Sequence, residues 1–122
     1  MEEKREIIKE IIDYQNYLKS EYGFDWDSVF GVIDKLEEEI KELKEALMSG
    51  KENKIEEEFG DILITVVNIS RFLNLDILKT LKKSFNKFKD RFKKMEEIAK
   101  ERKIDLKKLN INELDSLWEE AK

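Results

Sequence analysis

Residues 38–61, EEIKELKEALMSGKENKIEEEFGD, decide how this chain folds. On both sides of Gly50 the charged and apolar residues have the spacing that is typical of helices, and Ser49-Gly50 interrupts it. Residues three apart share a helix face, so each half presents a pair of carboxylates: Glu39 with Glu42, and Glu58 with Asp61. Two helices joined by a tight turn run antiparallel, and the two pairs can then face each other. We therefore predict a helical hairpin whose four carboxylates require a divalent cation between them.

The composition indicates an all-α protein. The chain has 122 residues, no proline and only four glycines, and 43% of its residues are charged. This length is typical of one domain, so we take residues 1–122 as a single domain. Cysteine and histidine are both absent, which excludes disulfides, thiolate sites and histidine-based acid–base chemistry. Any chemistry therefore depends on carboxylates, lysine, arginine, tyrosine or a bound metal.

Charge is distributed unevenly along the sequence. The net charge of −5 disfavours nucleic-acid binding in general. Residues 37–61 carry ten acidic residues against four lysines, whereas residues 79–94 carry eight basic residues against the single acid Asp90. The sequence shows neither a signal peptide nor an apolar run long enough to cross a bilayer. We expect a soluble, cytoplasmic protein with no membrane or nucleic-acid partner.

The apolar pattern predicts an antiparallel bundle of about four to five helices. The expected helices cover residues 3–20, 28–48 and 52–73, a stretch from the Asp76 cap to about residue 100, and a short segment from Asn112. Gly50 and Asn74 suit left-handed helix ends. The helix at 3–20 is an N-terminal addition to the domain. We expect dimerisation to complete the bundle, because so thin a domain has few ways to cover its apolar faces.

The helix expected at 52–73 is the most informative one. After Asp61 it is apolar nearly all round, which predicts a buried central helix. Its polar interruptions fall on one face: Glu58, Asp61, Thr65 and Asn68. A carboxylate in such surroundings is costly unless it is paired or binds metal, so we expect a partner for Asp61. Gly60 lies mid-helix, where glycine is unfavourable, and this indicates either close approach of another group or simple helix packing.

These residue types point to a particular metal and ligand. Carboxylates without histidine or cysteine select magnesium, with manganese as a possible substitute, over zinc or copper. A basic stripe follows the acidic helices: Lys83, Lys87, Arg91 and Lys94. Lys87 and Arg91 complement the charge of a polyphosphate, and a carboxylate outside the metal shell can take a proton from water. A ferritin-like di-iron bundle is excluded, because its motif requires histidine.

The motifs resemble those of a known family. E-E-x-x-E at residues 38–42, followed after a short spacer by E-x-x-D at 58–61, is the signature of the all-α nucleoside triphosphate pyrophosphohydrolases. The chain is most similar to the MazG type, over about residues 22–122. The matching segments are GFDWD (23–27), VIDKLEEEI (32–40), EEEFGDIL (56–63), VNISR (67–71), NKFKDRF (86–92) and ELDSLWEEAK (113–122).

The resemblance implies an activity and a set of site residues. Family members hydrolyse a nucleoside triphosphate to the monophosphate and pyrophosphate with magnesium, as dimers or higher oligomers, which implies a role in nucleotide-pool house-cleaning. The implied metal ligands are Glu39, Glu42, Glu58 and Asp61, of which Glu39 also counts as catalytic. Glu38 would lie beside them as an outer group or as the base. The substrate-binding residues would be Lys87, Arg91, Trp118 and Lys122, to which we add Asn68 from the polar face of its helix.

Each of these assignments has an alternative. Glu38 can be plain surface charge, Trp118 a core anchor and Lys122 a frayed end. Phe24 and Trp26 lie in a loop, where they can pack against a helix or face a substrate. The same fold can act on a narrower substrate, such as dUTP, dCTP or phosphoribosyl-ATP, or the chain can be a non-catalytic helical oligomerisation module. Some relatives carry two such domains in tandem, whereas this chain has one.

Overall fold

The computed structural model describes the backbone of residues 2–122 and the side chains of residues 6–122. Within these residues there are five α-helices, one short 3-10 helix and no β-strand, which confirms the predicted all-α fold. The elements are α1 (Glu2–Tyr22), α2 (Val29–Ser49), α3 (Glu52–Leu73), α4 (Ile77–Glu101), η1 (Leu106–Lys108) and α5 (Ile111–Glu120). They form two compact units, an N-terminal unit of Met1–Ile77 and a C-terminal unit of Leu78–Lys122. None of these described helices is both long and apolar enough to span a membrane.

The ends of α2 and α3 follow from two residues that stop helices. Gly50 ends α2 in the left-handed conformation, with φ of 69°, and its N–H donates to the carbonyl oxygens of Ala46 and Leu47. Asn74 ends α3 in the same way, with φ of 56°. Glycine and asparagine adopt positive φ at less cost than other residues. Both predicted helix ends are therefore confirmed, and the turn between α2 and α3 contains only Gly50 and Lys51.

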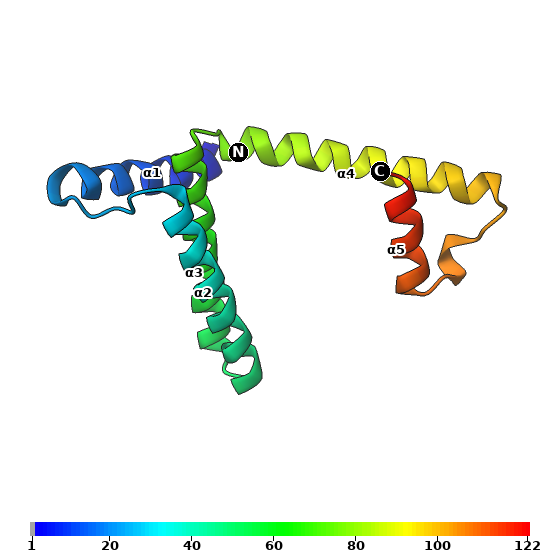
Figure 1. Ribbon diagram of the computed structural model, residues 1–122, viewed down its shortest axis with the longest axis horizontal. Helices are drawn as coiled ribbons and strands as arrows, with labels where there is room; N and C mark the ends of the chain where they lie inside the picture. Colours follow the sequence, from blue (N-terminus) through cyan, green and yellow to red (C-terminus); the bar gives the residue numbers. More distant parts are fainter. Residues whose placement is uncertain (1) are drawn as a thin grey trace. The chain divides into compact units, whose positions relative to one another are not determined.

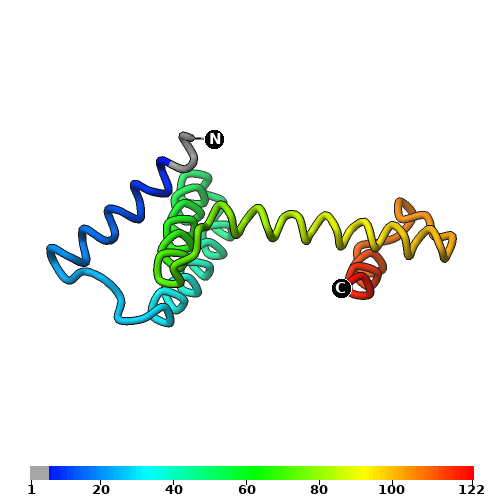
Figure 2. The backbone as a smooth tube through the Cα atoms, turned by 90° about the horizontal axis from the view of Figure 1, so that it is seen from above, coloured from blue at the N-terminus to red at the C-terminus, as the bar shows by residue number. Residues whose placement is uncertain are grey.

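In the N-terminal unit, α2 and α3 lie side by side as an antiparallel hairpin, and α1 crosses the open end of this hairpin (Figures 1 and 2). The apolar part of its core is small. Val32 is fully buried, and Ala46 and Val67 are nearly so. Four polar or charged side chains of the hairpin are also buried: Glu39, Glu58, Thr65 and Ser70. The contact between α2 and α3 is therefore polar in the region where the carboxylates were predicted.

The C-terminal unit has a core of its own. The connection after α4 reverses the chain, and α5 runs back at a steep angle to α4, which it approaches at its C-terminal end (Figure 1). Met95 on α4 packs with Leu117 and Ala121, and partly buried residues surround them: Ile98, Leu106, Leu109, Leu114 and Trp118. A reciprocal pair of side chain-to-backbone hydrogen bonds between Asn110 and Glu113 starts α5.

The expectation of a buried central helix at 52–73 is wrong for the single chain. Phe59, Leu63 and Ile64 on α3 are each about half exposed, because only α1 and α2 pack on this helix within the N-terminal unit. A methyl group at Gly60 would meet no other atom within 4 Å, so the close approach expected there does not occur in the described chain. Further exposed apolar side chains are Phe30, Ile33, Ile40 and Leu47 on α2, and Leu81, Phe85, Phe88 and Phe92 on α4.

Candidate active site

Glu39 lies inside the hairpin and is held by a hydrogen bond across it. The residue is only 6% exposed, and its Oε1 accepts a hydrogen bond from the hydroxyl of Thr65 on α3, which is also buried. Buried carboxylates are stable only where hydrogen bonds or opposite charges compensate them. Thr65 fixes the orientation of Glu39 but, as a neutral group, does not balance its charge. The sequence places Thr65 on the polar face of α3, and this contact explains why a polar residue occurs there.

The carboxyl groups of Glu42 and Glu58 meet between α2 and α3. The interaction with the Glu58 side chain is the largest cause that raises the pKa of Glu42 above its ordinary value. Desolvation and the charges of Glu58 and Glu38 also raise this pKa, and Lys35 lowers it. Glu58 is 6% exposed; its Oε1 lies 3.7 Å from the ammonium of Lys54, while its Oε2 is buried without a hydrogen-bond partner. A buried oxygen without a partner is costly, and it marks a place for a cation or a donor.

Asp61 and Glu38 lie at the rim of this acidic group. Asp61 is exposed, so the expectation of a carboxylate buried among apolar side chains is wrong. Residues three apart differ by about 60° around a helix, and α2 therefore covers Glu58 while it leaves Asp61 open to water. Glu38 is also exposed, and its Oε2 lies 3.7 Å from the ammonium of Lys35. Both carboxylates are therefore accessible from solvent.

The acidic group fits magnesium by the chemistry of its donors. Its carboxylate oxygens are hard ligands, and Glu58 Oε2 has no other partner. As they stand, however, no three acidic side chains among residues 6–122 are arranged to hold a metal ion. The hairpin brings Glu42 to Glu58 and Glu39 to Thr65, and it leaves Asp61 at the surface. Ligand carboxylates must be ionised, so a bound ion would have to lower the pKa of Glu42, which its contact with Glu58 raises.

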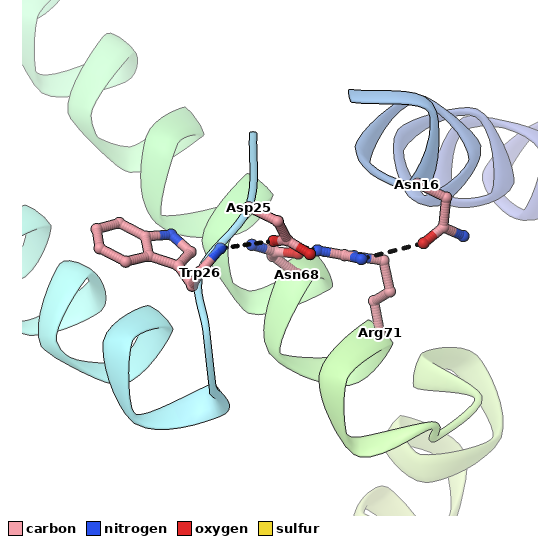
Figure 3. Close-up of polar contacts among 5 residues, drawn as sticks. All are labelled: Asn16, Asp25, Trp26, Asn68 and Arg71. Carbon is pink, nitrogen blue, oxygen red and sulfur yellow. Dashed lines mark hydrogen bonds and ion pairs between the residues drawn. The ribbon is translucent and has the colours of Figure 1, made fainter. Parts of the chain in front are cut away.

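Arg71 connects α1, α3 and the segment before α2 (Figure 3). Its Nη2 donates to Asp25 Oδ1 at 2.6 Å, its Nη1 to Asn16 Oδ1 at 3.0 Å, and its Nε to Asn68 Oδ1 at 2.9 Å. The side chains of Arg71 and Asp25 are only 10% and 8% exposed. Asn68, predicted to bind substrate, thus has a partner within the fold, and its carbonyl oxygen is already used. The sequence contains Asp25 and Arg71 in two matching segments but gives no sign that they pair.

Trp26 packs against the first turn of α2. A Cβ atom at Gly31 would lie 3.0 Å from the Trp26 ring, so any larger residue there would require the ring to shift. Trp26 is nevertheless 47% exposed and Phe24 is 73% exposed. Both aromatic residues line a pocket of 370 Å³ together with Gln15, Leu18, Gly23, Asp25, Asn68 and Arg71. The packing alternative is therefore correct for one side of Trp26, while a role for Phe24 toward a substrate stays a prediction.

In the C-terminal unit, four of the predicted substrate-binding residues share one pocket, which we call the basic pocket. It has a volume of 710 Å³ and is lined by Lys87, Arg91, Trp118 and Lys122, with Ser84, Phe88, Asp90, Lys94 and Ala121. The guanidinium of Arg91 stacks on the Trp118 ring at 4.2 Å, and its Nε donates to the Trp118 carbonyl oxygen at 2.9 Å. Its Nη2 is buried and has no hydrogen-bond partner. A guanidinium held in place with a free donor suits an oxyanion.

Trp118 both packs and lines the pocket. Its ring lies 4.7 Å from that of Phe88, and the residue packs against the core around Met95. It is therefore a core anchor, which is the alternative named for it, and it also fixes Arg91. Lys122 reaches the same pocket, with its side chain 65% exposed.

Glu119 is an acidic residue among these cations that the sequence interpretation missed. Its Oε2 lies 2.9 Å from Lys122 Nζ, and its Oε1 lies 3.7 Å from Arg91 Nη2. The hydrogen bond to Lys122 is the largest cause that lowers the pKa of Glu119, followed by the charge of Lys122; desolvation opposes them and Arg91 adds a small effect. Glu119 is therefore ionised at neutral pH. The next residue, Glu120, pairs instead with Arg102 at 2.7 Å.

Comparison with protein families agrees with this organisation. Residues 31–96 match the family described as the MazG nucleotide pyrophosphohydrolase domain, which is more than half of the chain. The matched range contains Lys87 and Arg91. It also contains Glu39, Glu42, Glu58 and Asp61 of the α2–α3 hairpin, which we call the acidic hairpin. The chain therefore belongs to the MazG nucleotide pyrophosphohydrolase domain family, as its motifs predicted.

Individual relatives extend the match beyond this range. A nucleoside triphosphate pyrophosphohydrolase/pyrophosphatase MazG of Thermotoga maritima is 50% identical over 103 residues, which are 84% of this chain and 39% of that protein. A nucleoside triphosphate pyrophosphohydrolase of Escherichia coli is 33% identical over 104 residues, which are 82% of this chain and 39% of that protein. The uncharacterized protein YabN of Bacillus subtilis is 39% identical over 71 residues, which are 58% of this chain and 14% of that protein. The chain thus spans well under half the length of these relatives.

Proposed function

We propose that this chain is a magnesium-dependent nucleoside triphosphate pyrophosphohydrolase, which converts ribo- or deoxyribonucleoside triphosphates to monophosphates and pyrophosphate. One observation carries the proposal. Glu42 meets the buried Glu58 between two packed helices, and Glu58 Oε2 has no partner. Carboxylates that meet without sufficient opposite charge favour a bound cation. The names of two relatives and the family of the domain support the reaction. House-cleaning of the nucleotide pool is the role we infer.

In this proposal the acidic hairpin binds the metal and activates water. The ligands are Glu39, Glu42, Glu58 and Asp61, for magnesium or for manganese in its place. A bound ion supplies neutralisation of phosphoryl oxygens and a lower pKa for a bound water. Thr65 keeps Glu39 oriented, and Glu38 at the solvent-accessible rim accepts the proton from the attacking water. The bond that breaks is the anhydride between the α- and β-phosphoryl groups, and pyrophosphate leaves.

The basic pocket binds the phosphates and the nucleotide. Arg91 is already fixed by Trp118, so it loses little conformational freedom when it binds an oxyanion. Lys87 and Lys122 are exposed and act as mobile positive charges, and Trp118 covers the nucleotide. Asn68 uses its amide nitrogen toward the substrate, because Arg71 occupies its carbonyl oxygen.

Pyrophosphate release tests this function. The full chain is incubated with a panel of ribo- and deoxyribonucleoside triphosphates, in magnesium, in manganese and with excess chelator. We expect equal amounts of pyrophosphate and monophosphate, only when a divalent ion is present. Release of single phosphate, or release that survives the chelator, would exclude the proposed reaction.

The same panel addresses the narrower substrates. Phosphoribosyl-ATP is added to the panel for this purpose. If only dUTP, only dCTP or only phosphoribosyl-ATP is hydrolysed, the proposed metal site still stands, but the enzyme has a specific role in place of broad house-cleaning. No turnover of any member, together with no effect of magnesium on the melting temperature, would favour a non-catalytic oligomerisation module.

We also propose that the chain forms a homo-oligomer, a dimer or a tetramer. The observation that favours this is the apolar surface on the hairpin, where Phe59, Leu63 and Leu47 are each at least half exposed. Surfaces of this kind are covered in oligomers. Light scattering at increasing concentration should give a mass above that of one chain. Leu63→Glu should reduce this mass, whereas Lys44→Glu at an exposed polar position of α2 should not.

A further inference from the structure

The carboxylate of Glu119 lies between two cations that face the basic pocket. It is 2.9 Å from Lys122 Nζ and 3.7 Å from Arg91 Nη2. The contact with Lys122 has the length of a charge-assisted hydrogen bond, as a phosphate oxygen would form, and the longer separation from Arg91 is an ion pair without a hydrogen bond. Glu119 therefore occupies, with its own side chain, the kind of position that an oxyanion ligand would take.

Arg91 does not need Glu119 for its own position. The stack on the Trp118 ring and the hydrogen bond from Nε to the Trp118 carbonyl oxygen already fix the guanidinium. The 3.7 Å separation from Glu119 is too long for a hydrogen bond, and Arg91 Nη2 is a buried donor without a partner. The two groups attract each other, and the donor that Nη2 offers is still unused.

Glu119 is also able to move away. Its side chain is 53% exposed, and that of Lys122 is 65% exposed. The two residues are three positions apart in the sequence. Exposed ion pairs are weak, so a multiply charged anion can replace Glu119 at both cations. An ionised carboxylate that stays close to the pocket then repels that anion.

We propose that Glu119 is a built-in competitor for the oxyanion site formed by Arg91 and Lys122, and that it limits how tightly pyrophosphate and triphosphate groups are held. The inference rests on the proposed function in that phosphates enter this pocket. Its consequence is easier release of the pyrophosphate product. Glu119 contacts the binding cations and takes no part in bond breaking, so it is a residue that sets affinity.

Pyrophosphate binding to the full chain tests the proposal without any turnover. Binding of sodium pyrophosphate is measured by calorimetry in low salt with excess chelator, which leaves the acidic hairpin without metal. We expect Glu119→Gln to bind pyrophosphate about threefold to fivefold more tightly than the unmodified chain, because it removes an exposed negative charge from between two cations. The gain should shrink at high salt. Glu119→Asp, which keeps the charge, should stay close to the unmodified chain.

Glu120→Gln is the matched control. It makes the same change of net charge on the neighbouring residue, whose partner Arg102 does not line the pocket. We expect its affinity for pyrophosphate to be unchanged. An equal gain in both glutamine variants, no gain in Glu119→Gln, or a weaker affinity there would overturn the proposal, and so would the absence of pyrophosphate binding to every form. Failure of the proposed hydrolysis is seen separately, as the absence of turnover in magnesium.

Discussion

Glu42 in the N-terminal unit and Glu119 in the C-terminal unit are both helical glutamates, yet their pKa values shift in opposite directions. The pKa of Glu42 is raised, and the largest cause is another carboxyl group, that of Glu58. The pKa of Glu119 is lowered, because its nearest partner is the ammonium of Lys122. In the acidic hairpin, Lys35 and Lys54 lie 3.7 Å from Glu38 and Glu58 but do not offset the contact between Glu42 and Glu58, whereas Lys122 lies 2.9 Å from Glu119 at the end of α5. This difference supports the proposal that the hairpin, rather than the end of α5, binds an added cation.

The largest effect should come from removing a proposed ligand at the rim of the hairpin. Asp61→Asn should reduce turnover about a thousandfold or more, because it deletes one anionic oxygen from the metal site. Since Asp61 is exposed, the melting temperature without metal should hardly change. Turnover is measured at saturating magnesium and substrate, with Glu56→Gln, an exposed residue of the same helix, as the control. Near-normal turnover in Asp61→Asn would remove Asp61 from the site.

The second effect sharpens the comparison between the arginine pairs of the two units. Arg71→Ala leaves Asp25 buried without its partner, which should cost about 3–5 kcal/mol of unfolding free energy. The pair of Arg102 and Glu120 is exposed on both sides, so Arg102→Ala should have little effect. Urea unfolding measures the unfolding free energy of both variants. For Arg71→Ala it is followed by Trp26 fluorescence in a Trp118→Phe background, and for Arg102→Ala by Trp118 fluorescence in a Trp26→Phe background. Similar losses for the two variants would contradict this difference.

A third effect concerns substrate affinity. Lys87→Ala should raise the Michaelis constant for the triphosphate about tenfold with little change in kcat, because an exposed lysine in the basic pocket contributes attraction to phosphates. Steady-state kinetics with Lys93→Ala as the control provide the measurement, since Lys93 is exposed on the same helix but does not line the pocket. An unchanged Michaelis constant for Lys87→Ala would argue against its phosphate role.

The smallest effect is on the pH dependence of stability without metal. Because the folded-state pKa of Glu42 is raised, Glu42 contributes stability below its unfolded-state pKa that is lost as the pH rises through the folded-state value. The pKa of Glu120 is lowered by its hydrogen bond with Arg102, so its contribution is lost as the pH falls through that lower value. As the pH rises, the melting temperature of Glu42→Gln relative to the unmodified chain should therefore increase, and that of Glu120→Gln should decrease. The same change in both variants would contradict the opposite pKa shifts.

The helices could be predicted from the sequence because their ends depend on local residues. Gly50 and Asn74 each stop a helix through their own backbone preference, and the observed ends lie where these residues predict them. The amphipathic pattern likewise predicted the short helix α5, whereas the packing of Trp118 in the core was only an alternative to substrate binding. These features need no knowledge of how distant segments pack.

Burial and pairing could not be predicted in the same way. The sequence suggested that Asp61 is buried and α3 central, whereas Glu58 is buried and Phe59 is exposed, since packing partners decide which side of an apolar helix is covered. The bond between Asp25 and Arg71 joins residues 46 positions apart, and no local pattern specifies it. Glu119 was missed because no sequence motif marks an acidic residue that lies beside cations predicted to bind phosphate. Its role follows only from its distances to Lys122 and Arg91.

The most direct test of the central claim is the melting temperature of the chain as a function of magnesium concentration, without nucleotide. If the hairpin of α2 and α3 binds the ion, stability should rise with the logarithm of the metal concentration above the dissociation constant, by about 2.7 kcal/mol at a hundredfold excess over it. Glu58→Gln should abolish this rise, and Glu45→Gln, at an exposed position of α2, should preserve it. A flat curve for the unmodified chain, or a rise that persists in Glu58→Gln, would contradict a metal site in the acidic hairpin.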